Sequence, residues 1–467
     1  MLAAGLAAGI AASPVPAAGE PAATVIRLGE LEILPVLDAG FGAFAVSNTQ
    51  NGSGNPGRRN WIEGFVAPGL DLAHPLGDGS LYAGLTAIGS LTRGDGDAQA
   101  PSSTAGRPEH LGLDRLVLGW RSGDRFATLG RDAVDFSAGR QGLVIGDGFL
   151  IADGTAEGFR RAAYVTGPRG AFDRTAILKL DTAPVRADLF HLEGQVDQRL
   201  MNGNDAAATK LYGANVEWFG GDGDTARSVY DARDWYLGAT ALRLYDADRG
   251  VAAARDGMTV YALRAGGTLL AAIGNGFEDF AFYGEYGIQR NDAAGRRQHA
   301  RAWYLEPQYT ASMLPWSPRL SYRYAHFSGD NDDADGTDHA WDALYTGGGP
   351  RGFGSWDQGE IYGRYAGGNS NLNSHMLHLR LQPLDQLAIG IIHYWHAYDR
   401  KPAGVGDTAL MREVNLYAEW ETPLPGLGIS AVLGAAKAGA GRRQELGLAA
   451  GADRTTWLGQ IVFGYSF

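Results

Sequence analysis

The chain has 467 residues, a net charge of −12, 69 glycines and no cysteine. No apolar run reaches the about 18 residues that a transmembrane helix needs, the glycines keep no period of three, and the hydrophobic content of 45% is too high for a disordered chain. These properties exclude a helical membrane protein, a collagen, a disordered chain and a disulfide-bonded scaffold. The acidic net charge also argues against nucleic-acid binding.

The first 18 residues form an apolar stretch of Ala and Gly that ends in Ser-Pro-Val-Pro-Ala-Ala. An apolar segment followed by small residues predicts a signal peptide over residues 1–18, cleaved near Ala17 or Ala18. No basic segment precedes it, which suggests that the true start lies upstream; the alternative is a flexible apolar leader. The folded domain is predicted to span residues 31–467.

Along the rest of the chain the hydrophobic pattern has a period of two, and this pattern is clearest at the C-terminus. From Trp457 to Phe467 every second residue is aromatic, aliphatic or glycine, whereas the residues between them are mostly small or polar. The alternation predicts a β-strand with one apolar face. A final strand that ends on an aromatic residue is typical of bacterial outer-membrane barrels, so the barrel-assembly machinery is a predicted partner through the strand that ends at Phe467. The alternative is an edge strand of a soluble sandwich.

The same alternation recurs earlier in the chain. Leu320 and Tyr322, for example, alternate with Ser321 and Arg323. Comparable segments lie at residues 280–289, 360–365, 376–382 and 413–420. No amphipathic helix is predicted that could cover the apolar faces, so a lipid bilayer must cover them. The pattern predicts an all-β fold, a transmembrane antiparallel β-barrel with its apolar face on outer-membrane lipid and its polar face on a lumen.

Turn-forming residues divide the predicted strands unevenly. Short connections are predicted at residues 76–79, 122–124, 167–170 and 383–385, and long ones at about 94–109, 194–210, 220–233 and 329–356. Short periplasmic turns and long outer loops are typical of outer-membrane barrels. The strand-like runs predict a single barrel of about 18 strands (16 to 20), wide enough to leave an aqueous channel unless loops plug it.

Arginine dominates the basic residues. Of 40 Lys and Arg residues only Lys179, Lys210, Lys401 and Lys437 are lysines, so 36 are arginines. Arginine presents a rigid, permanently charged fork that suits carboxylates, although a GC-rich genome, which favours Arg, Gly and Ala codons, is an alternative explanation. Five arginines alternate with apolar residues and are predicted to line a constriction that attracts anions: Arg115, Arg319, Arg323, Arg364 and Arg380. The alternative for each is an ion pair with a neighbouring carboxylate that holds strands together.

Three stretches resemble, in order and spacing, the alginate export family of outer-membrane barrels. They run from Leu129 to Ile151, from Tyr324 to Tyr345 and from Gly368 to Pro383. The resemblance implies a monomeric barrel of the same strand number, an arginine-rich constriction, gating loops or turns, and outward transport of an anionic uronic-acid polysaccharide. It adds Arg131 and Arg140, which lie in the first stretch, to the predicted constriction. It also implies that a periplasmic export complex docks at the short turns.

Several residues keep other functions open. Glu360, Glu413 and Glu419 share the predicted lumen face with the arginines, which would make the pore zwitterionic and suit a different polymer or a small solute. A porin for the uptake of small anionic or sugar-like solutes is therefore the nearest alternative, and a plugged structural barrel is another. An outer-membrane hydrolase is the distant alternative. His326 and Ser328 share a strand face, but no acidic residue is placed to orient them and no GxSxG motif occurs, so no enzyme activity is expected.

One segment has the spacing of a calcium-binding loop. Asn331, Asp333 and Asp335 precede a glycine, and Asp342 falls at the position of the last carboxylate ligand. The first position is Asn, and Asp342 is shorter than the usual Glu, so a solvated acidic hairpin in an outer loop is the alternative. Apart from this calcium ion, no cofactor is predicted.

Overall fold

The computed structural model describes residues 25–48, 57–96, 109–154, 162–168, 170–197, 206–220, 235–247, 254–270, 274, 277–292, 297–331, 334–348, 351–448 and 454–467. The predicted signal peptide at residues 1–18 lies outside these segments. No helix in them is long and apolar enough to cross a membrane.

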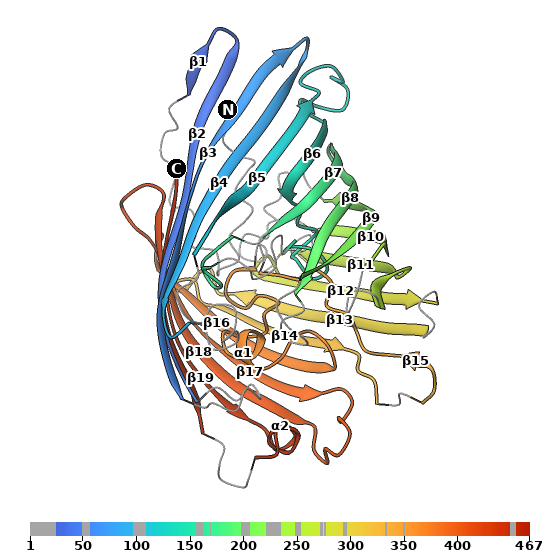
Figure 1. Cartoon of the computed structure of the whole chain (residues 1–467), viewed down its shortest axis with the longest axis vertical. Coiled ribbons are helices and arrows are strands. Elements are labelled where there is room, and N and C mark those ends of the chain that lie inside the picture. The colour runs from blue at the N-terminus through green and yellow to red at the C-terminus, as the bar shows by residue number, and fades with distance from the viewer. Residues whose placement is uncertain are drawn as a thin grey trace.

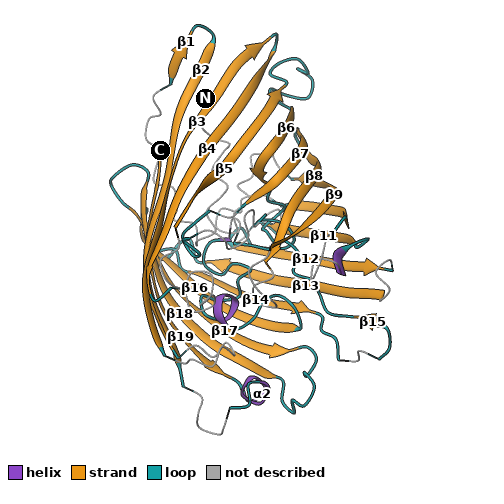
Figure 2. Ribbon diagram, viewed as in Figure 1, coloured by secondary structure: helices purple, strands orange, loops and turns teal. Residues whose placement is uncertain are grey.

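The chain forms a closed, antiparallel 18-stranded β-barrel, as the sequence predicts (Figures 1 and 2). The barrel strands are β2 (Leu31–Ser47), β3 (Arg58–Leu76), β4 (Gly79–Gly94), β5 (Glu109–Arg121), β6 (Val134–Gly142), β7 (Ala171–Asp181), β8 (Val185–Asp197), β9 (Ala206–Phe219), β10 (Tyr236–Tyr245), β11 (Thr259–Gly267), β12 (Phe280–Asn291), β13 (Arg297–Thr310), β14 (Arg319–Phe327), β16 (Leu372–Leu384), β17 (Leu387–Tyr398), β18 (Ala409–Glu421), β19 (Leu427–Ala438) and β20 (Thr456–Ser466). The remaining elements are short: β1 (Ile26–Leu28), β15 (Thr337–Asp338), α1 (Tyr362–Tyr365) and α2 (Ala440–Glu445).

The barrel closes where its first and last strands meet. β2 pairs with β3 on one side and with β20 on the other, in a register that places Phe41 opposite Phe463. At the end of this seam the backbone N–H of Leu37 donates to the carbonyl oxygen of Phe467 at 3.0 Å, and the N–H of Phe467 donates back to Leu37 at 2.9 Å. The closed ring therefore leaves no long unpaired strand edge at the seam.

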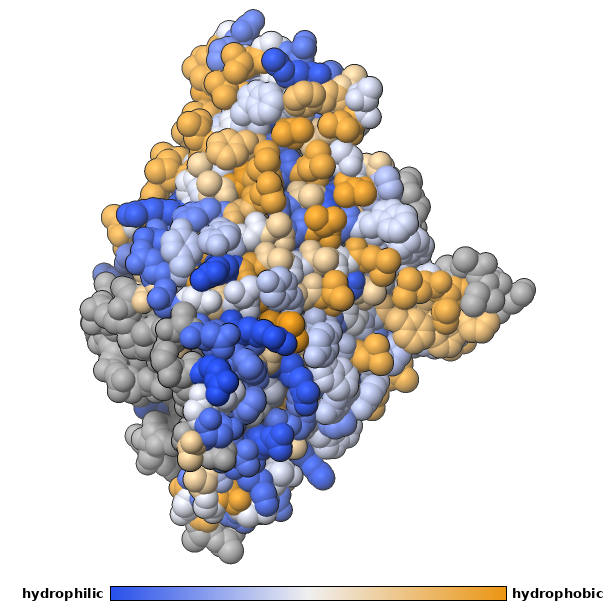
Figure 3. Space-filling model, turned by 90° about the vertical axis from the view of Figure 1, so that its right-hand side faces the viewer, coloured by the Kyte–Doolittle hydropathy of each residue, from blue (hydrophilic) through white to orange (hydrophobic). Residues whose placement is uncertain are grey.

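Side chains alternate between the two faces of the wall. Leu433 and Trp457 point outward and are exposed, whereas their neighbours Val432 and Leu458 point inward and are buried. The alternation predicted for residues 280–289, 319–325, 376–382, 413–420 and 455–467 follows this pattern. In Figure 3 apolar residues spread over the upper half of one face, and hydrophilic residues gather in the lower half. Lipid-facing barrel surfaces have such apolar bands.

Several predicted segments differ from the structure; the short turn predicted at 122–124, for example, is part of the longer connection 122–133. Residues 360–365 are not a strand, because Tyr362–Tyr365 form the single turn α1 within the connection between β14 and β16. Residues 167–170 are not a strand-to-strand turn, because they lie inside the connection 143–170. The connection that contains 220–233 joins β9 to β10, so strand order puts it at the same end as the tight turns and not among the outer loops.

The two ends of the barrel have different connections. The end at which β2 begins and β20 finishes has tight turns at residues 77–78 and 385–386. The opposite end carries the longest connections, residues 143–170 and 328–371. By the usual asymmetry of outer-membrane barrels, the first end is periplasmic and the second is outer. Both long connections turn back into the ring of strands, where α1 lies (Figure 1).

The outward position of Leu433 is open to a stability test. Leu433 is 67% exposed in the middle of β19, so we expect Leu433→Arg to lower the free energy of unfolding by about 2–4 kcal/mol, because a charge is moved into hydrocarbon. Urea unfolding in lipid vesicles measures this change. Leu424, 58% exposed in the connection 422–426, is the matched control, and Leu424→Arg should cost less than about 1 kcal/mol. Equal effects at both positions would contradict the assignment of the lipid-facing surface.

Candidate functional site

The two long connections meet inside the lumen and bind each other. Ile151 and Tyr345 form a parallel β-bridge, and the N–H of Ala152 donates to the carbonyl oxygen of Tyr345 at 2.8 Å. The Phe149 ring packs edge-on against the Trp356 ring at 4.9 Å between centroids. The described residues of 143–170 and 328–371 therefore act as one body, which we call the lumen plug.

Two wall carboxylates hold the plug through its backbone. Glu63 of β3 accepts hydrogen bonds from the N–H groups of Val165 at 2.5 Å and Thr166 at 2.7 Å. Glu413 of β18 accepts hydrogen bonds from the N–H groups of Ile361 and Tyr362, both at 2.8 Å, at the start of α1. Both side chains are fully buried, so these hydrogen bonds offset part of the cost of taking a polar carboxyl group out of water.

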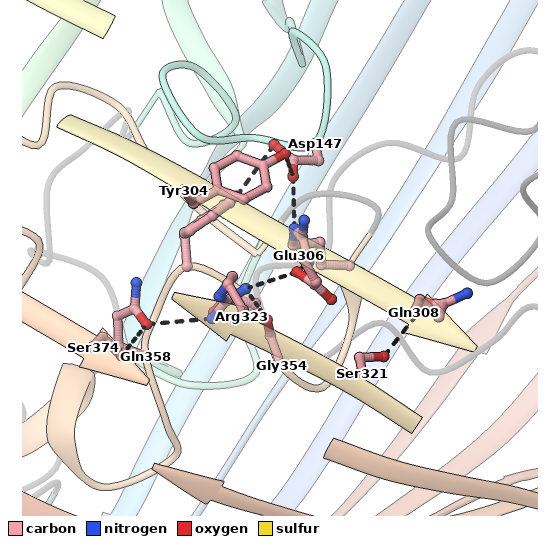
Figure 4. Close-up of polar contacts among 12 residues, drawn as sticks. Asp147, Tyr304, Glu306, Gln308, Ser321, Arg323, Gly354, Gln358 and Ser374 are labelled. Carbon is pink, nitrogen blue, oxygen red and sulfur yellow. Dashed lines mark hydrogen bonds and ion pairs between the residues drawn. The ribbon is translucent and has the colours of Figure 1, made fainter. Parts of the chain in front are cut away.

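A buried ion-pair cluster joins the two connections to the wall. Arg351 of one connection donates from Nε to Asp147 of the other at 2.7 Å, and from a terminal nitrogen to Glu306 of β13 at 2.6 Å. Tyr304 of β13 also donates to Asp147, at 2.7 Å (Figure 4). We call Asp147, Glu306 and Arg351 the latch; their side chains are between 2% and 4% exposed.

The latch keeps Asp147 ionised. Burial raises the pKa of the Asp147 carboxyl, but the charge of Arg351 and the hydrogen bond from Tyr304 outweigh this effect, so the pKa lies below its usual value. Breaking such a buried pair by removing one partner typically costs 3–5 kcal/mol, on the order of half the stability of a small domain. The latch is therefore a polar link between the two connections that is costly to break.

Arg323 of β14, one of the arginines predicted to line a constriction, points into the lumen and holds the plug. Its guanidinium donates to the carbonyl oxygens of Gly354 at 2.7 Å and Ser355 at 3.2 Å, and to the side chain of Gln358 at 3.3 Å (Figure 4). Its guanidinium carbon also lies 4.4 Å from the ring centroid of Trp356. Because Arg323 is fully buried, it does not face a solute in this conformation.

Two of the predicted arginines lie on the lumen wall between the plug and the short-turn end, in a region that we call the vestibule. Arg115 of β5 pairs with Asp71 of β3, and Arg380 of β16 pairs with Glu419 of β18. Arg319 lies at the short-turn end of β14 and donates to the Thr310 hydroxyl at 3.2 Å. The structure adds two further vestibule pairs: Arg121 with Asp135 at 2.9 Å, and Arg186 with Asp181 at 2.6 Å.

The other three predicted arginines lie elsewhere. Arg364 belongs to α1 and not to a strand; it pairs with Glu360 at 2.8 Å and donates to Gln460 of β20 at 2.9 Å, so it ties the plug to the wall. Arg140 pairs with Asp173 and donates to the carbonyl oxygen of Asp114 at 3.0 Å, next to a register shift in β6, and its side chain is 11% exposed. Arg131 is exposed in the connection between β5 and β6.

The segment predicted as a calcium loop has a different arrangement. Both carboxylate oxygens of Asp342 accept hydrogen bonds from Arg255, at 2.7 and 2.6 Å. Asp342, the residue expected to be the last calcium ligand, is therefore already paired with an arginine. Asp335 accepts a hydrogen bond from the N–H of Thr337 at 2.7 Å, and Asp333 lies outside the described residues. Within the described segments no group of three or more His, Asp or Glu side chains is placed to hold a metal ion.

The pair considered for a hydrolase is committed to structural contacts. The Ser328 hydroxyl donates to the carbonyl oxygen of His339 at 2.6 Å. His326 Nδ1 lies 2.8 Å from the side-chain oxygen of Asn373. Neither contact forms the nucleophile-to-base hydrogen bond that hydrolysis requires.

The latch and the Glu63 anchor were not identified from the sequence. Asp147 lies in one of the stretches that resemble the family, but nothing in the sequence distinguishes its carboxylate from those of other loop residues. Arg351 stands in the glycine-rich segment 347–354, which has no strand alternation. Glu63 alternates with outward residues of β3, so the period of two places it on the lumen face without indicating what it binds.

Solved porin structures share the fold. The chain is similar to a BenF-like porin from Pseudomonas fluorescens Pf-5 (TM-score 0.58, 10% identity, 93% of this chain and 98% of that chain). It is also similar to Pseudomonas aeruginosa OccK5 (OpdH) (TM-score 0.56, 10% identity, 93% and 98%) and to P. aeruginosa OccK2 (OpdF) in complex with glucuronate (TM-score 0.55, 12% identity, 93% and 98%). No curated protein sequence matches the chain.

A family model described as alginate export matches residues 127–411, more than half of the 467 residues. This match covers both connections that form the plug, and all the strands from β6 to β17. Together with the porin-like barrel, it indicates a channel of the bacterial outer membrane. The chain belongs to the alginate export family.

Proposed function

We propose that this channel conducts an anionic, alginate-like polyuronate outward across the outer membrane when the plug opens. The observation that carries the proposal is a set of three partly exposed arginine–carboxylate pairs in the vestibule that leads to the plug: Arg115–Asp71, Arg121–Asp135 and Arg186–Asp181. In the Arg115–Asp71 pair both side chains are 18% exposed, and in the Arg121–Asp135 pair they are 26% and 20% exposed. Water therefore reaches these pairs, in contrast to the latch.

Exposure to water determines whether a passing anion can displace the protein carboxylate of an ion pair. A solvent-exposed pair contributes roughly 0–1 kcal/mol, so a carboxylate on a sugar can replace the protein carboxylate at little cost. The guanidinium fork binds any carboxylate in the same bidentate way. A series of such weak, exchangeable sites favours entry of a polyanion and still allows its release.

Uptake of small uronates is the second candidate. It is supported by the similarity to OccK2, whose structure was solved in complex with glucuronate, a single carboxylated sugar. The carboxylates of the vestibule pairs also reduce the net positive charge that a long polyanion would meet. Both candidates use the same arginine chemistry, and they differ in the length of chain that passes the plug and in direction. For export, a periplasmic complex would dock at the short-turn end.

The vestibule arginines are tested by selectivity and block. We expect Arg115→Gln/Arg121→Gln to lower anion selectivity in planar bilayers and to raise the half-blocking concentration of uronate oligomers about tenfold, because two carboxylate sites of up to about 1 kcal/mol each are lost. The control Arg27→Gln/Arg400→Gln removes the same charge from exposed positions outside the lumen. Block that strengthens with oligomer length supports the polymer, and equal block by glucuronate supports uptake of the monomer. Unchanged anion selectivity in the double variant, or equal block of the wild-type channel by neutral oligosaccharides, would contradict the proposal.

The latch is tested by removing its cation. Arg351→Gln leaves the buried Asp147 without an arginine and leaves Glu306 with only the longer contact to Arg323 at 3.9 Å, which should destabilise the closed plug by on the order of 3–5 kcal/mol and raise the fraction of time spent in a high-conductance state. Single-channel recording measures this fraction. Arg442→Gln, which removes an arginine paired with Glu445 in α2, should leave it unchanged. A folded Arg351→Gln barrel, checked by its heat-modifiable migration, with wild-type conductance would show that the plug does not gate the channel.

Acid should open the channel only at low pH. The pKa of Asp147 is below its usual value of about 3.9, so its contribution to the closed plug is fully present above that value and is lost as pH falls through the lowered pKa. We therefore expect the part of the conductance that depends on Asp147 to stay constant between about pH 8 and 5 and to rise only below about pH 4. Recordings from a pH titration check this, and Asp147→Asn should remove the component below pH 4. A rise in conductance between pH 8 and 5 that depends on Asp147 would be inconsistent with the latch.

A further inference from the structure

Four basic side chains gather on the outer face of two neighbouring strands. They are Arg290 of β12 and Arg297, His299 and Arg301 of β13, and we call them the outer basic patch. All four are exposed, whereas the residues next to them in each strand, such as Gln289 and Ala300, are buried on the lumen side. Alternation therefore points the four side chains away from the lumen.

The strand register brings these side chains together. Arg290 is the direct cross-strand partner of His299, and Ile288, two residues before Arg290, is the partner of Arg301. Arg290 and Arg301 are thus diagonal neighbours on one face, a relation that places such residues about 7–8 Å apart. Two guanidinium groups at this spacing can bind the same anion or two anions on one molecule.

The patch lies at the outer edge of the lipid-facing surface. Going along β13 from the patch toward the middle of the strand, the next outward residue is Trp303, and Leu305 follows it. The Trp303 ring packs against Tyr324 at 5.1 Å and against His326 at 6.0 Å between centroids. Such aromatic groups mark the membrane interface in outer-membrane barrels, and the patch lies on their outer-loop side. There the headgroups of the outer leaflet meet the protein.

Within the described segments, the arginines of the patch form no ion pair with a carboxylate. Arg290, Arg297 and Arg301 form no ion pair with any residue that the structure describes, and the only carboxylate pair of the patch is His299 with Asp292 at 3.9 Å. By contrast, the arginines of the latch and the vestibule are each paired with a carboxylate. Exposed, unpaired arginines at a lipid interface require anions from the surroundings to be stabilised.

We propose that the outer basic patch binds the phosphate groups of a phosphorylated glycolipid headgroup in the outer leaflet. An arginine guanidinium binds phosphate through two parallel hydrogen bonds. Arg290 and Arg301, the diagonal neighbours, supply two such guanidinium groups on one face. The apolar and aromatic surface next to the patch contacts the acyl chains of the same lipid. This inference depends on the barrel lying in the outer membrane and not on the identity of the transported solute.

The test compares lipid binding by matched charge variants of the full-length barrel in detergent. The probes are diphosphorylated lipid A, its dephosphorylated form and inorganic phosphate, and bound lipid is counted by native mass spectrometry. We expect wild-type protein to bind diphosphorylated lipid A, and Arg290→Gln/Arg301→Gln to bind it about tenfold more weakly. The control Arg125→Gln/Arg131→Gln removes two exposed arginines at the opposite end of the barrel and should bind as wild type does.

Each other outcome bears on the proposal. Equal binding of the dephosphorylated lipid by wild-type protein, or unchanged binding by the double variant, would overturn it. Inorganic phosphate that competes at the same concentration as the lipid would show a free-anion site instead of a lipid site. If the double variant does not fold, as judged by heat-modifiable migration, Arg301→Gln alone and the charge-conserving Arg290→Lys/Arg301→Lys provide the comparison. We expect the lysine variant to keep more affinity than the glutamine variants, because it keeps the charge and loses the fork.

Discussion

Where water is excluded, an unpaired backbone N–H or carbonyl group is costly. This constraint applies to the wall, which lies in the bilayer, and to the plug, which is buried inside the barrel. In the wall the constraint is met by the ring of strands, closed by the pairing of β2 with β20. In the lumen irregular backbone must find partners, and it does so through the bridge between Ile151 and Tyr345 and through the Glu63 and Glu413 carboxylates. A loop that enters a barrel therefore needs wall residues dedicated to its own main chain.

Burial separates the ion pairs of the lumen into two kinds. In the latch the charges of Asp147, Glu306 and Arg351 are out of water, so each depends on the others and the pairs hold one arrangement of the plug. In the vestibule, pairs such as Arg121 with Asp135 are partly hydrated and bind weakly. The same residue types thus serve rigidity in one region and exchangeable contacts in the other, and composition alone does not distinguish them.

The wall could be predicted from the sequence because a strand repeats every two residues, and that period is visible in any segment of eight or more residues, such as 319–325 with its flanks. Arg323 was placed on the correct face for this reason. The hydrogen-bond partners of Arg323 could not be predicted from the sequence, because Gly354 and Gln358 belong to a segment without a repeating hydrophobic pattern. Residues 360–365 were wrongly predicted as a strand, because an alternating pattern over so few residues fits one helical turn as well as it fits a strand. The contact between 151 and 345 joins residues far apart in the chain, and no local pattern encodes it.

The seam between β2 and β20 also sets an order for biogenesis. β2 is the first barrel strand in the chain and β20 is the last, so the ring cannot close until its final strand has been delivered to the membrane. A chain in which either strand is missing has two unpaired strand edges, which favour pairing with other chains. The closed ring, and with it the channel, therefore forms only when β2 and β20 pair.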